Sequence, residues 1–257
     1  MKYITIIGIF SILLFSTAST LHTPPIVIRH DKSDAEYIKL AEQFKPYMCH
    51  LNLPDCEGTI IAEQWAITAA HCAIEIKKKL EKGKKHCVIM NDKKVEVQEV
   101  IIHPKWKDEG YHDMALIKFQ ERPKATQLAK LYTDGDELGQ VTYFVGKGYT
   151  GNGIKGIEKT YGQLRAATNR VKSVNEFWLA WEFDDPRKSS NQLTDYEGIS
   201  GPGDSGGPAF IIRDDEIYVA GISSFQDHDG VEGIYGVTEY YTRVSQYINW
   251  IRDQIRH

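Results

Sequence analysis

The sequence contains few cysteines: four in 257 residues, at positions 49, 56, 72 and 87. An even number of cysteines is compatible with two disulfide bonds in an exported protein. No pair has the C-x-x-C spacing that is typical of zinc sites, so we expect no metal centre. The sequence also lacks a phosphate-binding glycine loop or another cofactor signature, and we expect no cofactor.

An excess of charge of one sign is also missing. The chain carries 31 Lys and Arg residues against 35 Asp and Glu residues, which gives a net charge of −4. Proteins that bind nucleic acids usually carry a basic excess, so we expect no nucleic-acid partner. The longest largely apolar run covers residues 4–15. Such a run is too short to span a bilayer as a helix, which needs about 20 residues.

The first 20 residues have the pattern of a secretory signal peptide. Lys2 supplies a positive charge, the apolar run follows, and small residues occupy positions 16–20. This order predicts a signal peptide at residues 1–20. We expect a short propeptide at residues 21–25 and a mature domain at residues 26–257. The mature protein would be secreted or periplasmic, with no membrane partner and no lipid anchor, because no cysteine lies near the predicted cleavage site.

Short runs rich in β-branched and aromatic residues recur along the mature chain, with turn signals between them. This pattern predicts an all-β sandwich or barrel. Residues 130–139 form a polar linker that divides the domain into halves at about residues 26–130 and 140–242. Apolar residues at helical spacing then predict a C-terminal α-helix at about residues 244–256. The predicted strands lie at residues 58–61, 65–68, 95–102, 115–119, 141–145, 177–181, 208–212, 217–222 and 240–244.

The segment GDSGGP, residues 203–208, contains the candidate nucleophile Ser205. Three glycines around a serine are compatible with a simple tight turn or with a nucleophile elbow. An α/β-hydrolase would place its acid and its histidine after the serine. Here the candidate partners His71 and Asp113 precede Ser205, and the helices of an α/β fold are missing. We therefore favour a different serine hydrolase, with the order His71, Asp113, Ser205.

Three ordered segments closely resemble the signature regions of the trypsin/chymotrypsin-like serine peptidases. They are TAAHC at residues 68–72, DMALIKF at residues 113–119 and GDSGGP at residues 203–208. The resemblance extends to residues 221–225 and 241–251 and covers most of the mature chain. It implies an all-β fold of two six-stranded antiparallel β-barrels, with the active site between them and a C-terminal α-helix. It also implies a serine endopeptidase that acts on protein or peptide substrates, and we expect a monomer.

By this resemblance, the catalytic residues are His71, Asp113 and Ser205. The backbone N–H groups of Gly203 and Ser205 would form the oxyanion hole, and a disulfide would join Cys56 to Cys72. Whether Cys49 and Cys87 form a second bridge stays open. The alternative to an enzyme is a catalytically silent binding module on the same fold, although all three catalytic residues are present.

Two features depart from the family pattern. The usual N-terminal motif is missing, and the nearest match is Ile26-Val27, whose freed amine would pair with Asp204. In the specificity pocket, Ile199 stands where trypsin-like members have an aspartate.

Other predicted substrate-binding positions are Ser224, Phe225, Gln226 and Glu239. Ser224 and Phe225 would offer the main-chain strand that pairs with an extended substrate. Glu239 could select a basic side chain, or Gln226 and Glu239 could narrow the pocket in favour of small side chains. Glu239 could also point to solvent, and the sequence does not decide among the three.

Overall fold

The structure is a computed structural model that describes residues 26–54, 56–107, 110–124, 126–158, 163–188 and 192–256. The predicted signal peptide and propeptide, residues 1–25, lie outside the described residues. Among the described helices, none is long and apolar enough to cross a lipid bilayer.

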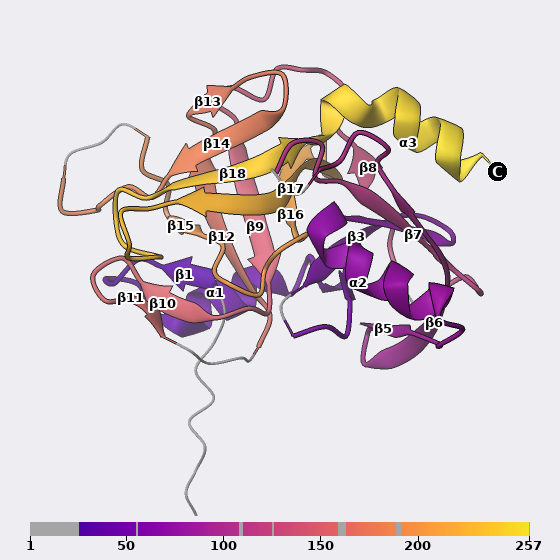
Figure 1. The fold of residues 1–257 in the computed structure, drawn as a ribbon. Helices are drawn as coiled ribbons and strands as arrows, with labels where there is room; N and C mark the ends of the chain where they lie inside the picture. The colour runs from indigo at the N-terminus through magenta and orange to yellow at the C-terminus, as the bar shows by residue number, and fades with distance from the viewer. Residues whose placement is uncertain are drawn as a thin grey trace, which may run out of the picture.

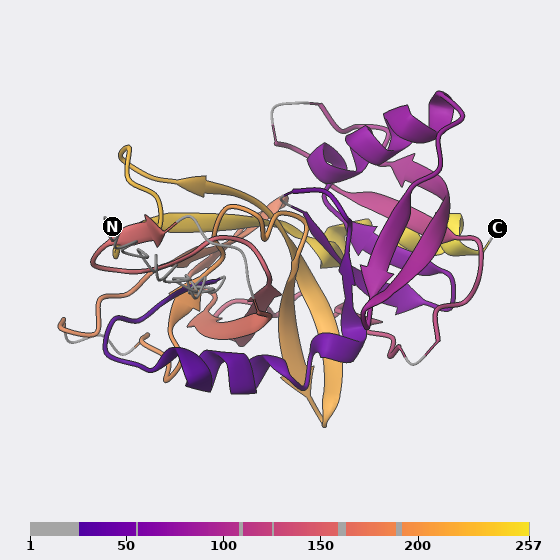
Figure 2. The same cartoon turned by 90° about the horizontal axis from the view of Figure 1, so that it is seen from below.

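Six strands of the first half form a closed barrel in the order β2-β3-β4-β7-β6-β5. A closed barrel leaves no strand edge unpaired, and its interior is filled by apolar side chains such as Ile60, Ile67 and Leu116. Figure 2 shows these strands gathered on one side of the molecule. Their bounds are β2 Met48–His50, β3 Glu57–Ala62, β4 Trp65–Thr68, β5 Cys87–Met90, β6 Lys93–Ile102 and β7 Ala115–Phe119.

The second half is built around a larger sheet in the order β12-β9-β16-β17-β18-β14-β13, with β8 paired to β17 off this path. The double-barrel, all-β prediction is confirmed, although this second sheet is a curled half-barrel rather than a closed six-stranded barrel (Figure 1). The bounds are β8 Lys130–Leu131, β9 Val141–Gly146, β12 Arg165–Arg170, β13 Ser173–Val174, β14 Trp178–Glu182, β16 Pro208–Arg213, β17 Glu216–Asp227 and β18 Thr238–Arg243.

The start of the described chain belongs with the second half. β1 (Ile26–Ile28) lies between β10 (Thr150–Asn152) and β15 (Gly198–Ile199), and β11 (Gly156–Glu158) completes this four-stranded sheet. Helix α1 (Asp34–Ala41) then packs along β12, where its Asp34 pairs with the buried Arg165. The closed barrel thus begins at β2, because β1 and α1 are held by strands that follow residue 140.

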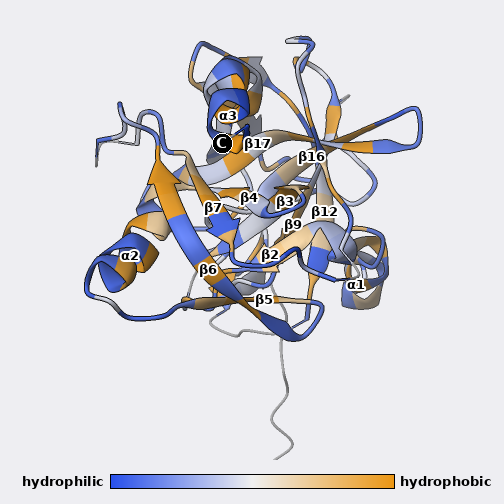
Figure 3. Ribbon diagram, turned by 90° about the vertical axis from the view of Figure 1, so that its right-hand side faces the viewer, coloured by the Kyte–Doolittle hydropathy of each residue, from blue (hydrophilic) through white to orange (hydrophobic). Residues whose placement is uncertain are grey.

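Two further helices carry the chain past the barrel ends. α2 (Ala70–Glu81) begins directly after β4, and the predicted C-terminal helix is confirmed as the short 3₁₀ turn η2 (Val244–Tyr247) followed by α3 (Ile248–Ile255). Another 3₁₀ turn, η1, covers Lys45–Tyr47. Figure 3 shows hydrophilic and hydrophobic residues mixed along α2 and α3, as amphipathic helices require. The buried Ile248 and Ile251 of α3 join the core cluster of the closed barrel.

A single disulfide is present among the described residues. Cys56 and Cys72 are joined, with their Cα atoms 5.9 Å apart, whereas Cys49 and Cys87 are free thiols. The bond ties the start of β3 to the first turn of α2, the helix that carries His71.

Candidate active site

His71 and Asp113 meet at one end of the closed barrel. His71 stands in the first turn of α2, directly after β4, and Asp113 lies just before β7. β4 and β7 are neighbouring antiparallel strands with Thr68 opposite Ala115, which brings these segments together. Nδ1 of His71 is 2.7 Å from Oδ2 of Asp113, and the His71 backbone N–H donates to Oδ1 at 2.9 Å. Both carboxylate oxygens therefore orient the histidine.

Asp113 is also held from the second half of the molecule. The hydroxyl of Ser224 on β17 donates to Oδ2 of Asp113 at 2.7 Å, and the hydroxyl of Thr242 on β18 donates to its backbone carbonyl at 3.0 Å. The Asp113 side chain is buried. Buried carboxylates need such donors, because an unsatisfied charge away from water is costly. The Ser224 hydroxyl thus acts on Asp113, in addition to the main-chain role predicted for this residue.

Ser205 lies in a loop that is pressed against both halves. Its carbonyl oxygen accepts a hydrogen bond from the Glu57 backbone N–H at 2.8 Å, and the next N–H, that of Gly206, donates to the Ser223 carbonyl at 2.9 Å. Gly206 has a φ of +75°, and a Cβ atom there would lie 2.2 Å from Oγ1 of Thr68. Only glycine allows this approach. The loop therefore packs where β4 ends and the His71 helix begins.

The hydroxyl of Ser205 and the imidazole of His71 do not form a hydrogen bond in the part of the chain that the structure describes. Nδ1 of His71 is occupied by Asp113, so Nε2 is the ring nitrogen left for a proton transfer. In enzymes without bound substrate such contacts are often long and tighten when the substrate binds. The Ser205 carbonyl oxygen lies 3.5 Å from Sγ of Cys72, the residue after His71, so the two segments are in contact.

The predicted oxyanion donors, the backbone N–H groups of Gly203 and Ser205, form no hydrogen bond with any described residue. Gly203 has a φ of +104°, and a Cβ atom at this position would lie 2.6 Å from the Cα atom of Gly148. This conformation needs a glycine and leaves the neighbouring amides available to an acceptor.

Asp204 is buried behind this loop. Burial raises the pKa of its carboxyl to about 7, although hydrogen bonds from backbone N–H groups lower it in part. Gly201 donates to Oδ2 at 2.8 Å, Gly148 donates to Oδ1 at 2.6 Å, and the backbone N–H of Ile26 also hydrogen-bonds to this carboxyl. The structure thus brings Ile26 and Asp204 together, as the N-terminal hypothesis requires.

The backbone of Ile26 is strained. It has a φ of +63°, which is a rare conformation for a β-branched residue. Its side chain is fully buried, and β1 is paired on both sides. The surrounding sheet therefore holds Ile26 at Asp204 against its own conformational preference.

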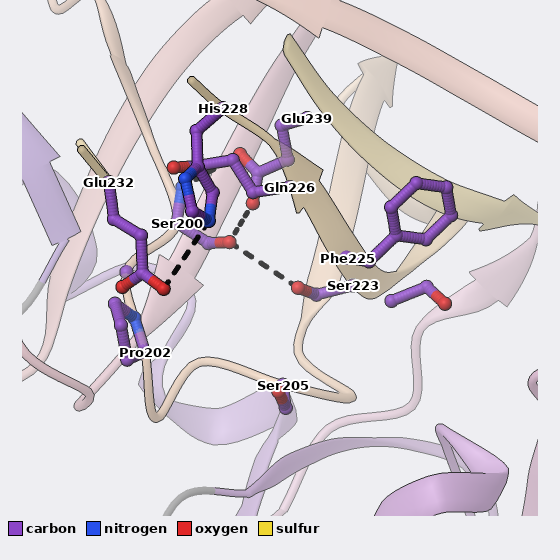
Figure 4. Close-up of a pocket in the computed structure, with 11 residues that line it drawn as sticks. Ser200, Pro202, Ser205, Ser223, Phe225, Gln226, His228, Glu232 and Glu239 are labelled. Atoms are coloured by element: carbon purple, nitrogen blue, oxygen red, sulfur yellow. Dashed lines mark hydrogen bonds and ion pairs between the residues drawn. The ribbon is translucent and has the colours of Figure 1, made fainter. Parts of the chain in front are cut away.

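A cavity of about 200 Å³ opens beside Ser205 (Figure 4). Its walls include the predicted residues Ser224, Phe225, Gln226 and Glu239. Phe225 is partly exposed and stacks on Tyr240, with their ring centres 4.7 Å apart. Glu239 does not point to solvent, because it is only 2% exposed.

Ile199, by contrast, does not line this cavity. It is fully buried and packs with Val27, Phe183 and Val237 in a separate apolar cluster. It pairs with Val27 in the sheet that holds β1. Ile199 therefore helps to hold the N-terminal strand in place and does not form the floor of the cavity.

Several pocket residues escaped the sequence analysis. The hydroxyls of Ser200 and Ser223 face the cavity, and His228 and Glu232 form an ion pair of 3.5 Å at its rim. Ser200 directly follows Ile199, and successive side chains of a strand point to opposite faces. The alternation could therefore have indicated that Ser200 faces the cavity if Ile199 does not. The rim pair comes from an irregular loop, for which periodicity offers no signal. No group of three or more His, Cys, Asp or Glu residues within the described ranges is arranged to hold a metal ion.

Comparison with known proteins agrees with this architecture. The family described as Trypsin matches residues 39–251. The chain therefore belongs to the trypsin family of serine peptidases.

The similar proteins include elastases and a coagulation factor. Chymotrypsin-like elastase family member 1 of Felis catus is 30% identical over 222 residues, which cover 78% of each chain. The Homo sapiens protein of the same name is 28% identical over 216 residues, or 78% of this chain and 81% of its own. Coagulation factor IX of Cavia porcellus is 27% identical over 218 residues, or 76% of this chain and 71% of its own. At these identities the chain shares the family of these proteins, and its own activity has to be argued from its site.

Proposed function

We propose that the protein is a serine endopeptidase that hydrolyses peptide bonds in protein or peptide substrates through an acyl-enzyme on Ser205. The observation that carries this proposal is the contact between Nδ1 of His71 and Oδ2 of Asp113, which are 2.7 Å apart, beside a cavity that Ser205 lines. Family membership supports the same reaction class.

Each residue of the proposed triad has one task. A serine hydroxyl is a weak nucleophile at neutral pH and needs a base within hydrogen-bond reach. Nε2 of His71 takes the proton from Ser205 as Oγ attacks the substrate carbonyl, and later gives it to the leaving amine. Asp113 keeps the proton of the neutral imidazole on Nδ1 and stabilises the imidazolium that forms during attack.

The N–H groups of Gly203 and Ser205 stabilise the negative oxygen of the tetrahedral intermediate. Both groups are free of hydrogen bonds to the described residues, so no internal bond has to break when the oxyanion forms. Loss of one such donor typically lowers kcat by about 10²- to 10³-fold.

An extended substrate pairs with the end of β17. β16 pairs with β17 only as far as Ile222, while β18 pairs with the opposite edge through Phe225 and Gln226. The edge of β17 beyond Ser223 therefore has no strand partner in the described part of the chain, and its N–H and C=O groups are available to a substrate backbone.

The mature protein begins at Ile26 in this proposal, after removal of a signal peptide at residues 1–20 and of residues 21–25. Cleavage before Ile26 would relieve its strained backbone and convert its amide into an ammonium group beside Asp204. A buried carboxylate without a charged partner is costly, and an ammonium group beside it reduces that cost. We place the exported product in the medium or the periplasm and expect a monomer.

N-terminal sequencing of the active protein checks the proposed start of the mature chain, and any first residue other than Ile26 contradicts it.

Labelling with a fluorophosphonate tests the reaction class, because only an activated serine reacts with such a probe. We expect one covalent adduct on Ser205, and neither an adduct nor peptide hydrolysis for Ser205→Ala. A folded wild-type protein without adduct would favour the catalytically silent binding module.

A further inference from the structure

The cavity beside Ser205 has a carboxyl group in its wall. Glu239 lies on β18, directly opposite Gln226 on β17, and its side chain is buried. Figure 4 shows Glu239 and Ser200 grouped on one side of the cavity, with Ser205 below them. Buried carboxyl groups are rare unless they are paired, so the contacts of Glu239 need an account.

Every hydrogen bond that Glu239 receives from a described residue comes from a neutral group. The Ser200 backbone N–H donates to Oε2 at 2.9 Å, and the Ser200 hydroxyl donates to Oε1. The hydroxyls of Ser200 and Ser223 lie 3.3 Å apart and extend this network. No Lys, Arg or His of the described chain forms an ion pair with Glu239. The carboxyl therefore lacks a cation, and one side of it faces the cavity.

The groups around Glu239 do not favour its ionised form. Burial raises the pKa of its carboxyl well above the usual range, and the nearby Asp204 of the serine loop raises it further. Tyr241, two residues along β18, belongs to the same buried network of Ser200 and Ser223 hydroxyls. At the rim, His228 is already paired with Glu232. Within the described residues, no cation balances Glu239, so we look for one in a bound substrate.

We propose that Glu239 determines specificity, and that the cavity binds a lysine or arginine side chain of the substrate with its charged end at Glu239. This inference rests on the proposed peptidase function, because the cavity adjoins Ser205. It assigns the cation-binding role to β18, while Ile199 is turned into the core.

The size of the cavity favours a long side chain over a small one. Its volume of about 200 Å³ is many times the about 10–15 Å³ that a single water needs. Gln226 does not close it, because its Oε1 accepts a hydrogen bond from the Gly233 N–H at 3.1 Å and is held towards the rim loop. Gln226 and Glu239 therefore do not narrow the cavity enough to exclude a side chain as large as lysine.

Binding of a cation would be linked to loss of a proton. The empty cavity favours the protonated carboxyl, whereas a bound ammonium or guanidinium group favours the carboxylate. The preference for a basic over a neutral side chain should therefore increase with pH. A ratio of two substrates isolates this effect, because any pH effect that is common to both rates cancels in the ratio.

The test measures kcat/KM for peptides that differ only in the side chain that enters the cavity: lysine, the apolar norleucine of similar length, and alanine. Wild type, Glu239→Gln and a control, Glu216→Gln, are compared between pH 6 and 9. Glu216 is an exposed residue of β17 that pairs with Lys130 at 3.1 Å, outside the cavity.

In the wild type and the control we expect lysine to exceed norleucine by about 10- to 100-fold at high pH, as for a hydrogen bond between charged groups. The ratio should fall as the pH is lowered, by up to about tenfold per pH unit. In Glu239→Gln it should approach 1 and lose its pH dependence. A lysine preference that survives in Glu239→Gln, or a preference of the wild type for alanine, overturns the proposal.

A binding measurement separates this proposal from the proposed function. Calorimetry with Ser205→Ala compares benzamidine with the neutral benzamide, so it needs neither turnover nor a folded Glu239 variant. Tighter binding of benzamidine that strengthens with pH supports the cation site even if the protein hydrolyses nothing. Equal binding of the two compounds refutes it even if Ser205 is labelled and peptides are cleaved.

Discussion

The hydroxyl of Ser224 donates a hydrogen bond to Oδ2 of Asp113 at 2.7 Å, on the same oxygen that faces Nδ1 of His71. This bond crosses from a strand of the second half to the end of the closed barrel. It couples the packing of the two halves to the orientation of the histidine.

The first prediction concerns Ser224→Ala. Loss of one hydrogen bond to a charged, buried group costs about 1.5–3 kcal/mol, so kcat/KM should fall by about 10- to 100-fold. Thr242→Val is the matched control, because Thr242 donates to the Asp113 backbone carbonyl rather than to its carboxylate. The control should lower the free energy of unfolding with a much smaller effect on kcat/KM. Equal losses of kcat/KM in both variants would indicate that Ser224 acts only through stability.

The second prediction concerns Asp113→Asn. The amide keeps the shape of the side chain but no longer selects the imidazole tautomer with its proton on Nδ1. We expect kcat to fall by about 10⁴-fold while the protein stays folded. Circular dichroism and steady-state kinetics check this pair of results. A variant with more than a tenth of the wild-type kcat would contradict the role given to Asp113.

The third prediction concerns the stability of a precursor that keeps residues before Ile26. The pKa of Asp204 is raised to about 7 in the folded chain, from 3.8 when unfolded, so the folded state binds the extra proton between these values. Its stability should fall as the pH rises from 4 to 7, by about 1.4 kcal/mol per pH unit from this group. Urea unfolding on a Ser205→Ala background measures this slope.

Asp204→Asn should remove that share of the slope. Glu197, whose pKa burial also raises to about 7, contributes a similar share, which Glu197→Gln should remove separately. In the precursor near pH 7, removal of this slope means that Asp204→Asn should raise the free energy of unfolding. After cleavage at Ile26 the same substitution should lower the free energy of unfolding by about 3–5 kcal/mol, because the amide would leave the buried ammonium unpaired. A substitution that stabilises both forms would contradict the pairing of Ile26 with Asp204.

The fourth prediction concerns the cysteines. Alkylation of the unfolded, unreduced protein should modify Cys49 and Cys87 only, and reduction should make Cys56 and Cys72 reactive, which mass spectrometry detects. Replacing Cys56 and Cys72 by alanine should cost about 3 kcal/mol on the loop-entropy model for this loop of 16 residues. The Cys49→Ala, Cys87→Ala pair serves as the control for the disulfide. A protein without reactive thiols before reduction would show that a second bridge forms.

Much of the fold followed from local patterns. β-branched runs predicted nine strands, each of which overlaps an observed strand, whereas the structure describes 18 strands. The spacing of Val244, Tyr247, Ile248 and Ile251 predicted the terminal helix. These patterns are legible because neighbouring residues decide strand and helix periodicity. The curl of the second sheet, by contrast, depends on which distant strands pair, and periodicity does not encode those pairings.

The site divides in the same way. The residue types and the order of His71, Asp113 and Ser205 were visible because each lies within a short motif next to a strand. Whether Glu239 faces solvent or the cavity was not visible, since both orientations suit a strand residue. The decision came from the partner strand carrying Gln226 and from Ser200, which lies far away along the chain.

By itself, the sequence determined the all-β class, the family resemblance and the ordered catalytic candidates, and that resemblance implied the bridge between Cys56 and Cys72. Only the tertiary structure decided that Ile26 reaches Asp204, that Ile199 is core and that Cys49 and Cys87 are free thiols. The physical reason is the separation along the chain between the residues that interact. Motifs and periodicities report the conformations of adjacent residues, whereas the burial of Glu239 and the contacts of Ile26 arise only when strands far apart in the chain are packed together.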